Sequence, residues 1–298
     1  MPRVSVVIPS YNHAQFLGAA LASVRAQTMG DWEAIVINNF STDDTEAVVT
    51  GVGDNRIRLV NFANHGVIAA SRNYGIALAT GEFVAFLDSD DTWKPGKLEK
   101  CLTRLAEGCE LVCHGERWVR EDGGSRDVIY GPESRATFDA LLFEGNCIST
   151  SAVVLRREWL ARVGGFDEDP ELVTAEDYHL WLKLAQAGVR IGFVPDILGD
   201  YRIHAGNQSR AALRNMRATQ AVFEKALATL PGPLPFAINV KTWRRRAILD
   251  YSGARGLQDN GQHWSAWPWF VRAILRWPLS PKFYAACALN ALHLRLVR

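Results

Sequence analysis

Residues 81–91 read Gly-Glu-Phe-Val-Ala-Phe-Leu-Asp-Ser-Asp-Asp, and this stretch predicts a strand that ends in three carboxylates. Residues 83–87 are all apolar, as in a buried strand, whereas the aspartates that follow repel one another. A divalent cation removes that conflict, because Mg²⁺ and Mn²⁺ bind oxygen ligands. Ligands of open α/β sheets also bind at the carboxyl ends of the strands. We therefore expect Asp90, assisted by Asp88 or Asp91, to hold Mn²⁺ or Mg²⁺ beside a phosphate-bearing substrate.

The same carboxylates have a simpler interpretation as a helix cap. Asp90 or Asp91 would then accept hydrogen bonds from the first backbone amides of a helix that starts near Pro95. A single aspartate is enough for a cap, so this interpretation leaves the other carboxylates unexplained.

Strands and helices alternate through the first part of the chain. Apolar runs predict the strands, and apolar side chains at helical spacing predict the helices between them. Strands are expected at residues 4–8, 34–37, 57–60 and 83–87, and helices at 16–27, 42–49 and 67–79. Further on we expect strands at 111–113 and 151–155 and a helix at 176–187 that ends at Gly188. This order predicts an α/β fold with a mostly parallel mixed sheet flanked by helices.

The composition indicates an ordinary globular chain in a reducing compartment. The 298 residues are 48% hydrophobic and 22% charged. The N-terminus shows no secretory signal, and the apolar stretch at 283–294 is too short to span a bilayer. The five cysteines are odd in number and form no Cys-x-x-Cys pair, which favours free thiols. We therefore expect a cytoplasmic protein.

The distribution of charge divides the chain near residue 208. Residues 209–298 carry 14 Lys and Arg against 3 Asp and Glu, while residues 1–208 carry 19 against 29. The basic part also holds five of the ten tryptophans and contains no catalytic motif. We expect a catalytic domain at 1–208, active without the remainder, and a helical C-terminal extension at 209–298.

The extension is expected to form helices at 211–230 and 236–251. Tryptophans alternate with cations at 243–246 and 267–277, and the arginines concerned are Arg244, Arg245, Arg246, Arg272 and Arg276. Helices of this kind bind anionic membrane surfaces, here the inner face of the cell membrane. The alternative is that the basic extension packs on the acidic domain or on a second subunit, giving a homodimer. Nothing in the catalytic part favours nucleic acid as a partner.

Eight segments, taken in order, resemble family 2 glycosyltransferases. They include Pro-Ser-Tyr-Asn at 9–12, Leu-Asp-Ser-Asp-Asp at 87–91 and Ala-Glu-Asp at 175–177. The segments are residues 4–12, 22–28, 41–45, 64–75, 80–83, 87–91, 175–181 and 201–204. The resemblance covers about residues 3–208 and implies a glycosyltransferase A-type fold, a nucleotide-sugar donor, a divalent metal and inverting transfer. It assigns donor contacts to Pro9, Tyr11, Asn12, Asn39, Asn64, Gly66, Arg72, Asp88, Ser89 and Asp90.

One segment departs from the family pattern. Where the family usually has two aspartates and a glycine, this chain has Asn38-Asn39-Phe40. In the family the second aspartate accepts a hydrogen bond from uracil, and Asn39 can accept only a weaker neutral bond. Phe40 would stack on the base or crowd it. Donor affinity and nucleotide identity therefore stay open.

The resemblance and the chemistry together suggest roles for four residues. Asp177 would be the base for the acceptor hydroxyl, kept ionised by the helix N-terminus with an ordinary or depressed pKa, and Glu176 would support it, unless both are first-turn acids that only stabilise the helix. Arg72 would bind the diphosphate, unless it is a solvated helix arginine. His204 would be a metal or phosphate ligand, unless it is a loop histidine bonded to the backbone.

The acceptor pocket is expected between two loops. Ser149 and Thr150 lie in one, and Asp167 lies in the other, although both could be plain connections. Together these features predict an inverting, metal-dependent glycosyltransferase for a saccharide or lipid-linked acceptor in surface-polysaccharide assembly. The alternatives are a sugar nucleotidyltransferase and a silent nucleotide-sugar-binding protein.

Overall fold

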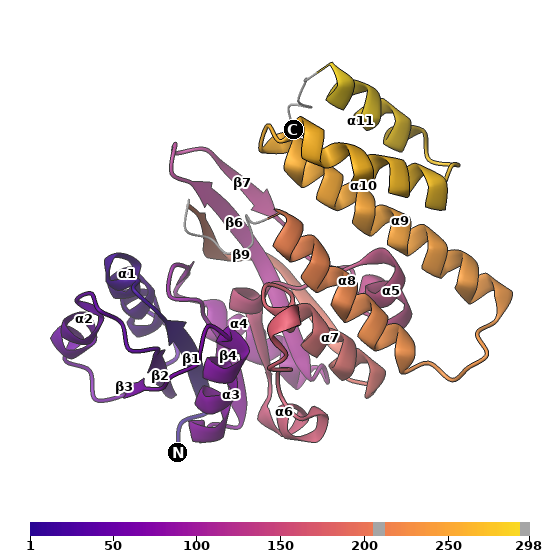
Figure 1. The fold of residues 1–298 in the computed structure, drawn as a ribbon. Helices are drawn as coiled ribbons and strands as arrows, with labels where there is room; N and C mark the ends of the chain where they lie inside the picture. Colours follow the sequence, from indigo (N-terminus) through magenta and orange to yellow (C-terminus); the bar gives the residue numbers. More distant parts are fainter. Residues whose placement is uncertain (205–211, 293–298) are drawn as a thin grey trace.

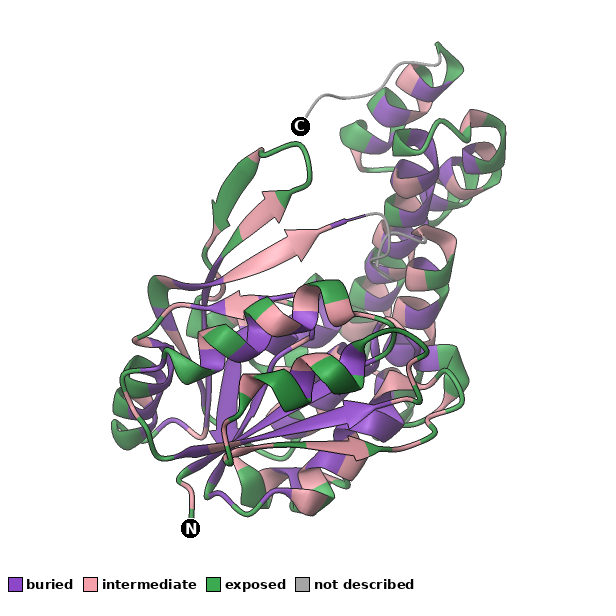
Figure 2. Cartoon of the chain, turned by 90° about the vertical axis from the view of Figure 1, so that its left-hand side faces the viewer, coloured by how far each residue is buried: buried purple, intermediate pink, exposed green. Residues whose placement is uncertain are grey.

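The first four apolar runs predicted as strands form one half of a nine-stranded sheet (Figure 1), whose central strands are buried (Figure 2). The runs predicted at 111–113 and 151–155 belong to strands of the other half. The computed structural model of the chain describes residues 1–204 and 212–292. Four neighbouring strands run parallel: β3 (Ile57–Asn61), β2 (Trp32–Asn38), β1 (Val4–Ser10) and β4 (Phe83–Phe86). They are connected by α1 (Ala14–Arg25), α2 (Thr45–Val52) and α3 (Ile68–Leu78). The predicted alternation of strands and helices is confirmed in this half.

The second half of the sheet is joined to β4 by antiparallel pairing. Its strands, in spatial order, are β8 (Val153–Arg156), β6 (Leu111–Arg120), β9 (Ile191–Ile203) and β5 (Thr92–Trp93), and β7 (Ser125–Val128) forms a hairpin with β6. β9 was not predicted, because Gly192, Pro195 and Gly199 interrupt its apolar pattern. It nevertheless pairs with β6 along most of its length, with irregular register after His114.

The remaining helices of the sheet domain are α4 (Lys97–Ala106), α5 (Phe138–Glu144), α6 (Arg157–Val163) and α7 (Glu176–Gln186). Short 3-10 turns lie at η1 (Glu133–Arg135), η2 (Thr150–Ala152) and η3 (Pro170–Leu172). α4 begins at Lys97 with Gly96 as its N-cap. The helix-cap interpretation of Asp90 and Asp91 is therefore wrong.

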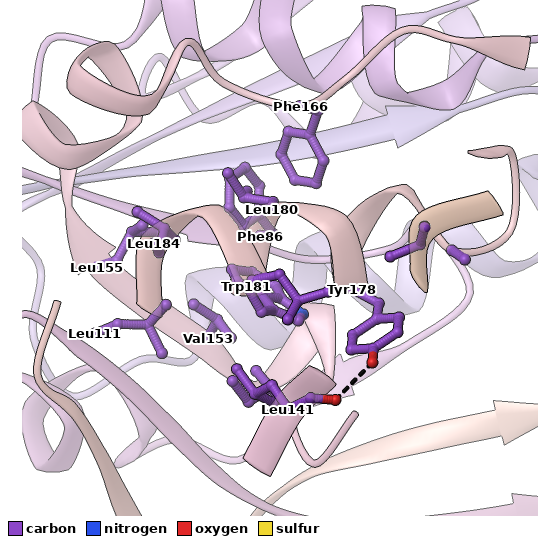
Figure 3. Packing of buried hydrophobic residues seen from close by; sticks show 14 of the residues in the cluster. Phe86, Leu111, Leu141, Val153, Leu155, Phe166, Tyr178, Leu180, Trp181 and Leu184 are labelled. Atoms are coloured by element: carbon purple, nitrogen blue, oxygen red, sulfur yellow. Dashed lines mark hydrogen bonds between the residues drawn. The ribbon is translucent and has the colours of Figure 1, made fainter. Parts of the chain in front are cut away.

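Successive residues of β1 face two different hydrophobic clusters, one on each side of the sheet. Val7 belongs to the larger cluster, where the side chains of α5 and α7 cover the sheet (Figure 3). Trp181 of α7 is fully buried there, and the Tyr178 hydroxyl donates to the carbonyl of Leu141 at 2.6 Å. This packing fixes α7, and with it the acidic residues at its start.

The C-terminal part consists of α8 (Ala212–Ala228), α9 (Phe236–Asp259), α10 (His263–Arg276) and α11 (Pro281–Ala291). α8 lies along α7, and Val222 and Phe223 complete the larger cluster. Lys225 pairs with Asp167 of the sheet domain at 2.8 Å. Packing on the acidic domain therefore describes α8, whereas α10 and α11 stand away from the sheet (Figure 1). The predicted boundary at 208/209 lies outside the described residues.

Candidate active site

The loops that follow β1 and β4 meet at one edge of the sheet. β1 and β4 are parallel neighbours, so their carboxyl ends lie side by side. The Oγ of Ser89, after β4, lies 2.8 Å from Nδ1 of His13, after β1. The buried Ser89 therefore ties the two loops together and orients the ring of His13.

Three side chains at this edge could hold a metal ion. His13 precedes α1, Asp90 follows β4 and His204 follows β9, and one ligand atom of each lies within 4.8 Å of the others. Nε2 of the buried His204 is 2.9 Å from Oδ2 of Asp90. Two imidazoles and a carboxylate suit a transition-metal ion such as Mn²⁺. The structure brings the predicted Asp90 and His204 together and adds His13, which the sequence did not predict.

Asp88 contacts a buried arginine rather than this group. Arg72 of α3 is only 3% exposed, and its two terminal nitrogens donate to Asp88 at 2.8 Å and to Glu176 at 2.6 Å. These bonds connect the end of β4 to the start of α7. The solvated-arginine alternative is therefore wrong, and the contact of Arg72 with a diphosphate stays a prediction.

Asp91 connects backbone segments. Its side chain is buried, with one oxygen accepting from Ser151 Oγ at 2.6 Å and the other from the backbone N–H of Arg202 at 2.9 Å. Burial, followed by the charge of Asp90, raises the pKa of Asp91 well above the ordinary aspartate value. Asp91 therefore holds β9 against the loop after β4 and lies outside the three-residue group.

Asp177 lies at the start of α7, beside Glu176. Thr150 donates to its Oδ2 at 2.8 Å, and the backbone N–H of Tyr178 donates to its Oδ1 at 2.6 Å. Burial, followed by the charge of Glu176, raises the pKa of Asp177 to about 6. The ordinary or depressed pKa expected from the helix N-terminus is therefore wrong, because lost hydration outweighs the helix dipole.

The backbone before α7 fixes Glu176. Thr174 has a φ of 90°, which is rare for a β-branched residue, and its N–H donates to Oε2 of Glu176 at 2.8 Å. Arg72 occupies the other oxygen. Both oxygens of Glu176 are therefore engaged, and this side chain positions the start of α7.

The residues predicted to bind the donor connect three loops. Oδ1 of Asn12 accepts from the N–H of Thr42 at 2.8 Å, and Oδ1 of Asn39 accepts from the N–H of Asn64 at 3.0 Å. Asn64 in turn accepts from the N–H of Gly66 at 2.9 Å. These bonds fix the loops after β1, β2 and β3 relative to one another.

Two aromatic side chains are exposed on these loops. Tyr11, two residues after Pro9 and directly after the end of β1, is 55% exposed, and Phe40 is 59% exposed after β2. The φ of Phe40 is 51°, in the left-handed region that favours glycine, the residue of the family pattern at this position. Apolar rings in water beside a polar loop network form a surface on which a nucleobase could stack.

The predicted acceptor residues lie in two places. Thr150 contacts Asp177, and Ser149 directly precedes it. Asp167 pairs with Lys225 of α8 and faces Nδ1 of His179 at 3.3 Å. The structure therefore places Thr150 at the predicted base and ties Asp167 to the C-terminal part.

Sequence reasoning also missed Glu116 of β6. This residue is fully buried, and the hydroxyl of Tyr130 donates to it at 2.7 Å. Burial, only partly offset by that hydrogen bond, raises the pKa of Glu116 to about 7. The signal was a glutamate inside an apolar run, Leu-Val-Cys-His-Gly-Glu at 111–116.

A pocket of about 450 Å³ opens beside the three-residue group. Its walls come from α1, β5, the β6–β7 hairpin and the end of β9. The lining residues are Phe16, Thr92, Val119, Arg120, Glu121, Asp200, Arg202 and His204. It contains both cationic and carboxylate side chains next to His204, which suits a polar ligand.

Comparison with known proteins identifies the family. The model for Glycosyl transferase family 2 matches residues 5–164, more than half of the chain. The chain belongs to glycosyltransferase family 2. The predicted family and enzyme class are thereby confirmed.

Two bacterial relatives each align with more than two thirds of this glycosyltransferase. It is 34% identical over 206 residues to the putative teichuronic acid biosynthesis glycosyltransferase TuaG of Bacillus subtilis, covering 68% of this chain and 79% of TuaG. It is 30% identical over 219 residues to WfgD of Escherichia coli, named a UDP-Glc:α-D-GlcNAc-diphosphoundecaprenol β-1,3-glucosyltransferase, covering 72% of this chain and 82% of WfgD.

Solved structures confirm the glycosyltransferase fold. The Staphylococcus aureus TarS 1–349 complex with UDP-GlcNAc matches 99% of this chain and 93% of its own, with a TM-score of 0.65 and 15% identity. The Pyrobaculum calidifontis mannosyltransferase PcManGT, in complex with GDP-Man and Mn²⁺, matches 98% of this chain and 85% of its own, with a TM-score of 0.64 and 22% identity. Within residues 1–204 and 212–292, the helices lack the combination of length and apolarity needed to cross a bilayer.

Proposed function

We propose that this glycosyltransferase transfers a sugar, with inversion, from a nucleotide-sugar donor to a hydroxyl of a saccharide or lipid-linked acceptor in surface-polysaccharide assembly. The name of TuaG refers to teichuronic acid biosynthesis, and that of WfgD to a UDP-Glc donor and a diphosphoundecaprenol-linked acceptor. The observation that carries the proposal is one connected site. Asp90 of the His13–Asp90–His204 group follows the same strand as Asp88, and Arg72 connects Asp88 to the start of the helix bearing Asp177.

The donor nucleotide would lie against the loops after β1, β2 and β3. Tyr11 and Phe40 would pack on the base, and Asn39 would bond to its edge. We favour a UDP-sugar, because the position of Asn39 corresponds to the uracil contact of the family pattern. The hydrogen bond from Asn64 leaves Asn39 with one further lone pair and two amide protons for that edge.

The His13–Asp90–His204 group would hold Mn²⁺ or Mg²⁺, with Asp88 and Asp91 as the neighbouring carboxylates. When bound, the metal ion neutralises charge on the departing nucleoside diphosphate. We favour Mn²⁺, because imidazole is a better ligand for it than for Mg²⁺, which prefers oxygen ligands and water.

Asp177 would take the proton of the acceptor hydroxyl. Its pKa of about 6 leaves it ionised at neutral pH and more basic than an ordinary aspartate. The hydrogen bonds from Thr150 and Tyr178 hold the carboxylate in one orientation. A sugar hydroxyl is a much weaker acid, so proton transfer would occur late, as the glycosidic bond forms.

The catalytic residues all belong to the proposed domain at 1–208, and the extension at 209–298 would support and place it. We assign the protein to the cytoplasmic side of the membrane, where nucleotide sugars are made. The basis is the acceptor named for WfgD and the reduced state expected of the thiols, all five of which are free.

A donor panel tests the function. UDP-Glc, UDP-GlcNAc, GDP-Man and a dTDP-sugar would be incubated with the full chain and Mn²⁺, and release of nucleoside diphosphate measured with and without a soluble lipid-diphosphate acceptor analogue. Acceptor-dependent release of UDP is expected. Donor binding by calorimetry without release from any donor would instead support the silent binding protein. Formation of a nucleotide sugar from a nucleoside triphosphate and a sugar phosphate would support the nucleotidyltransferase.

A further inference from the structure

The outer face of α10 carries an exposed apolar stripe. Phe270 and Ala273 are buried against α9 and α11. On the opposite face Pro268, Val271 and Leu275 follow one another at intervals of one helical turn, and all are exposed. The helix therefore has two apolar faces, of which the neighbouring helices cover only one.

The same surface continues onto α11. Leu279, between the two helices, is 76% exposed, like Leu275. On α11 the exposed positions are Pro281, Lys282, Tyr284, Ala285, Ala288 and Ala291. Of the twelve large hydrophobic side chains exposed in the described parts of the chain, six lie within residues 264–292. A tenth of the chain thus holds half of its exposed large apolar groups, too many for scattered surface positions.

The charged side chains of α10 and α11, which together form a helical hairpin, are all positive. Residues 263–292 contain Arg272, Arg276 and Lys282 and no Asp or Glu. Both arginines lie near the buried Asp250 of α9, at 3.8 Å and 2.7 Å, so a single carboxylate faces two guanidinium groups. The hairpin therefore offers apolar side chains flanked by cations, the composition of helices that lie on anionic membranes.

Of the five arginines predicted from sequence to face lipid, Arg272 and Arg276 lie on this hairpin, whereas Arg244 to Arg246 lie on α9. Arg245 is buried near Gly145, and Arg246 pairs with Glu224 of α8. Burial makes Arg245 unavailable to lipid headgroups, in contrast to the expectation for Arg244 to Arg246.

We propose that the α10–α11 hairpin docks this enzyme on an anionic lipid surface, with Val271, Leu275 and Leu279 entering the headgroup region. Arg272, Arg276 and Lys282 would lie at the level of the lipid phosphates. The role of docking, which is to bring the active site to a lipid-linked acceptor, rests on the proposed function, whereas docking itself does not. Vesicle binding is measured without donor or acceptor, so failure of docking and failure of transfer are distinguishable.

The test is flotation of the full chain with phosphatidylcholine vesicles, with or without phosphatidylglycerol. The parent protein should float with the anionic vesicles, and less so as salt is raised. The Leu275→Ser, Leu279→Ser double variant should lose at least about tenfold in vesicle affinity, because two exposed leucines no longer enter the lipid. Phe236→Ser is the matched control: Phe236 is 77% exposed, but it starts α9, far in sequence from the residues 247–257 that pack on α10.

Both variants change only exposed side chains, so hydrolysis of the donor in solution should equal that of the parent. The proposal is overturned if the parent ignores anionic vesicles at low salt, or if the double variant and the Phe236 control bind equally well. Light scattering tests whether a second copy of the chain binds this surface instead. If the parent is a dimer that does not bind vesicles, and Leu275→Ser, Leu279→Ser converts it to a monomer, the hairpin is a dimer interface.

Discussion

Arg72 of α3 and Glu176 of α7 form a buried ion pair 104 residues apart in sequence, with 2.6 Å between Nη1 and Oε1. The other terminal nitrogen of Arg72 binds Asp88. One guanidinium therefore connects the loop after β4, where a metal is proposed, to the helix that carries the proposed base. This geometry makes Arg72 a positioning residue for both halves of the site.

Arg72→Met should lower the free energy of unfolding by about 3–5 kcal/mol, because it leaves Glu176 buried without its partner. Urea unfolding followed by fluorescence measures the loss. Arg117→Met is the matched control, since Arg117 pairs with Asp127 at the surface and its removal should change little. Equal effects of the two substitutions would show that the buried pair does not anchor α7.

Asp177→Asn should reduce kcat by about 10²–10⁴-fold while donor affinity persists, since the amide keeps the shape but not the basicity. In the parent, kcat should fall as the pH drops through about 6, where Asp177 becomes protonated. Steady-state rates across pH, with donor affinity from calorimetry, check both effects. Loss of donor binding with little change in kcat would make Asp177 a binding residue.

The thermal stability of Asp177→Asn provides a second, independent test of the raised pKa. The folded pKa of Asp177 lies above the ordinary value of 3.8, so ionisation favours the unfolded state, and stability is lost as the pH rises through about 6. Asp177→Asn removes that cost. The variant should therefore have a higher Tm than the parent at pH 8. If the ionised carboxylate instead stabilises the fold, the variant should have the lower Tm.

His13→Gln should weaken Mn²⁺ binding at least about tenfold, because it removes one of three converging ligands. Electron paramagnetic resonance of free Mn²⁺ gives the affinity without any turnover. His179→Gln serves as the control, since His179 faces Asp167 outside this group. Unchanged Mn²⁺ affinity in His13→Gln would reduce the site to Asp90 and His204.

Asn39→Asp should tighten UDP binding by about 1 kcal/mol, since a carboxylate forms the stronger bond to the uracil edge. The substitution keeps an oxygen for the N–H of Asn64, so the loop network survives. Calorimetry with UDP, GDP and dTDP on both proteins measures the change. Tighter binding of another nucleotide, or unchanged UDP affinity, would refute a uracil contact.

The positions of Asp90 and Asp177 at the edge of the sheet were predictable because both lie beside short, strongly patterned segments. Asp90 follows an apolar strand, and Asp177 lies in the first turn of an amphipathic helix. Both patterns are recognisable in the sequence and predict a position at the edge of the sheet. His13 escaped prediction because a single histidine in a loop has no periodicity. Only the pairing of β1 with β4 shows that it meets Asp90.

Other features depend on contacts between distant segments. The pKa of Asp177 is set by burial, which a sequence does not display. The charge asymmetry indicated a separable extension, yet Val222 and Phe223 of α8 are fully buried in the cluster of the sheet domain. Net charge reports the surface of a segment and carries no information on which of its faces is buried.

The fold therefore changes the expectation for a shortened chain. A chain ending at residue 208 lacks α8 and should unfold at a lower temperature than the parent or aggregate, because the apolar face of α7 loses its cover. A chain ending at residue 262 retains α8 and α9 and should keep donor hydrolysis. Calorimetry and hydrolysis assays on both would decide, and a stable, active 1–208 fragment would show that α8 is dispensable.

Val7 and Phe223 belong to the same hydrophobic core. A ribosome adds about 5–20 residues per second, so about 10–40 s pass between the synthesis of these two side chains. Although α5 and α7 are made within that interval, the cluster lacks Val222 and Phe223 until α8 has been synthesised. The core of the sheet domain is therefore completed only after α8 has been made, and until then the growing chain exposes apolar surface that can aggregate.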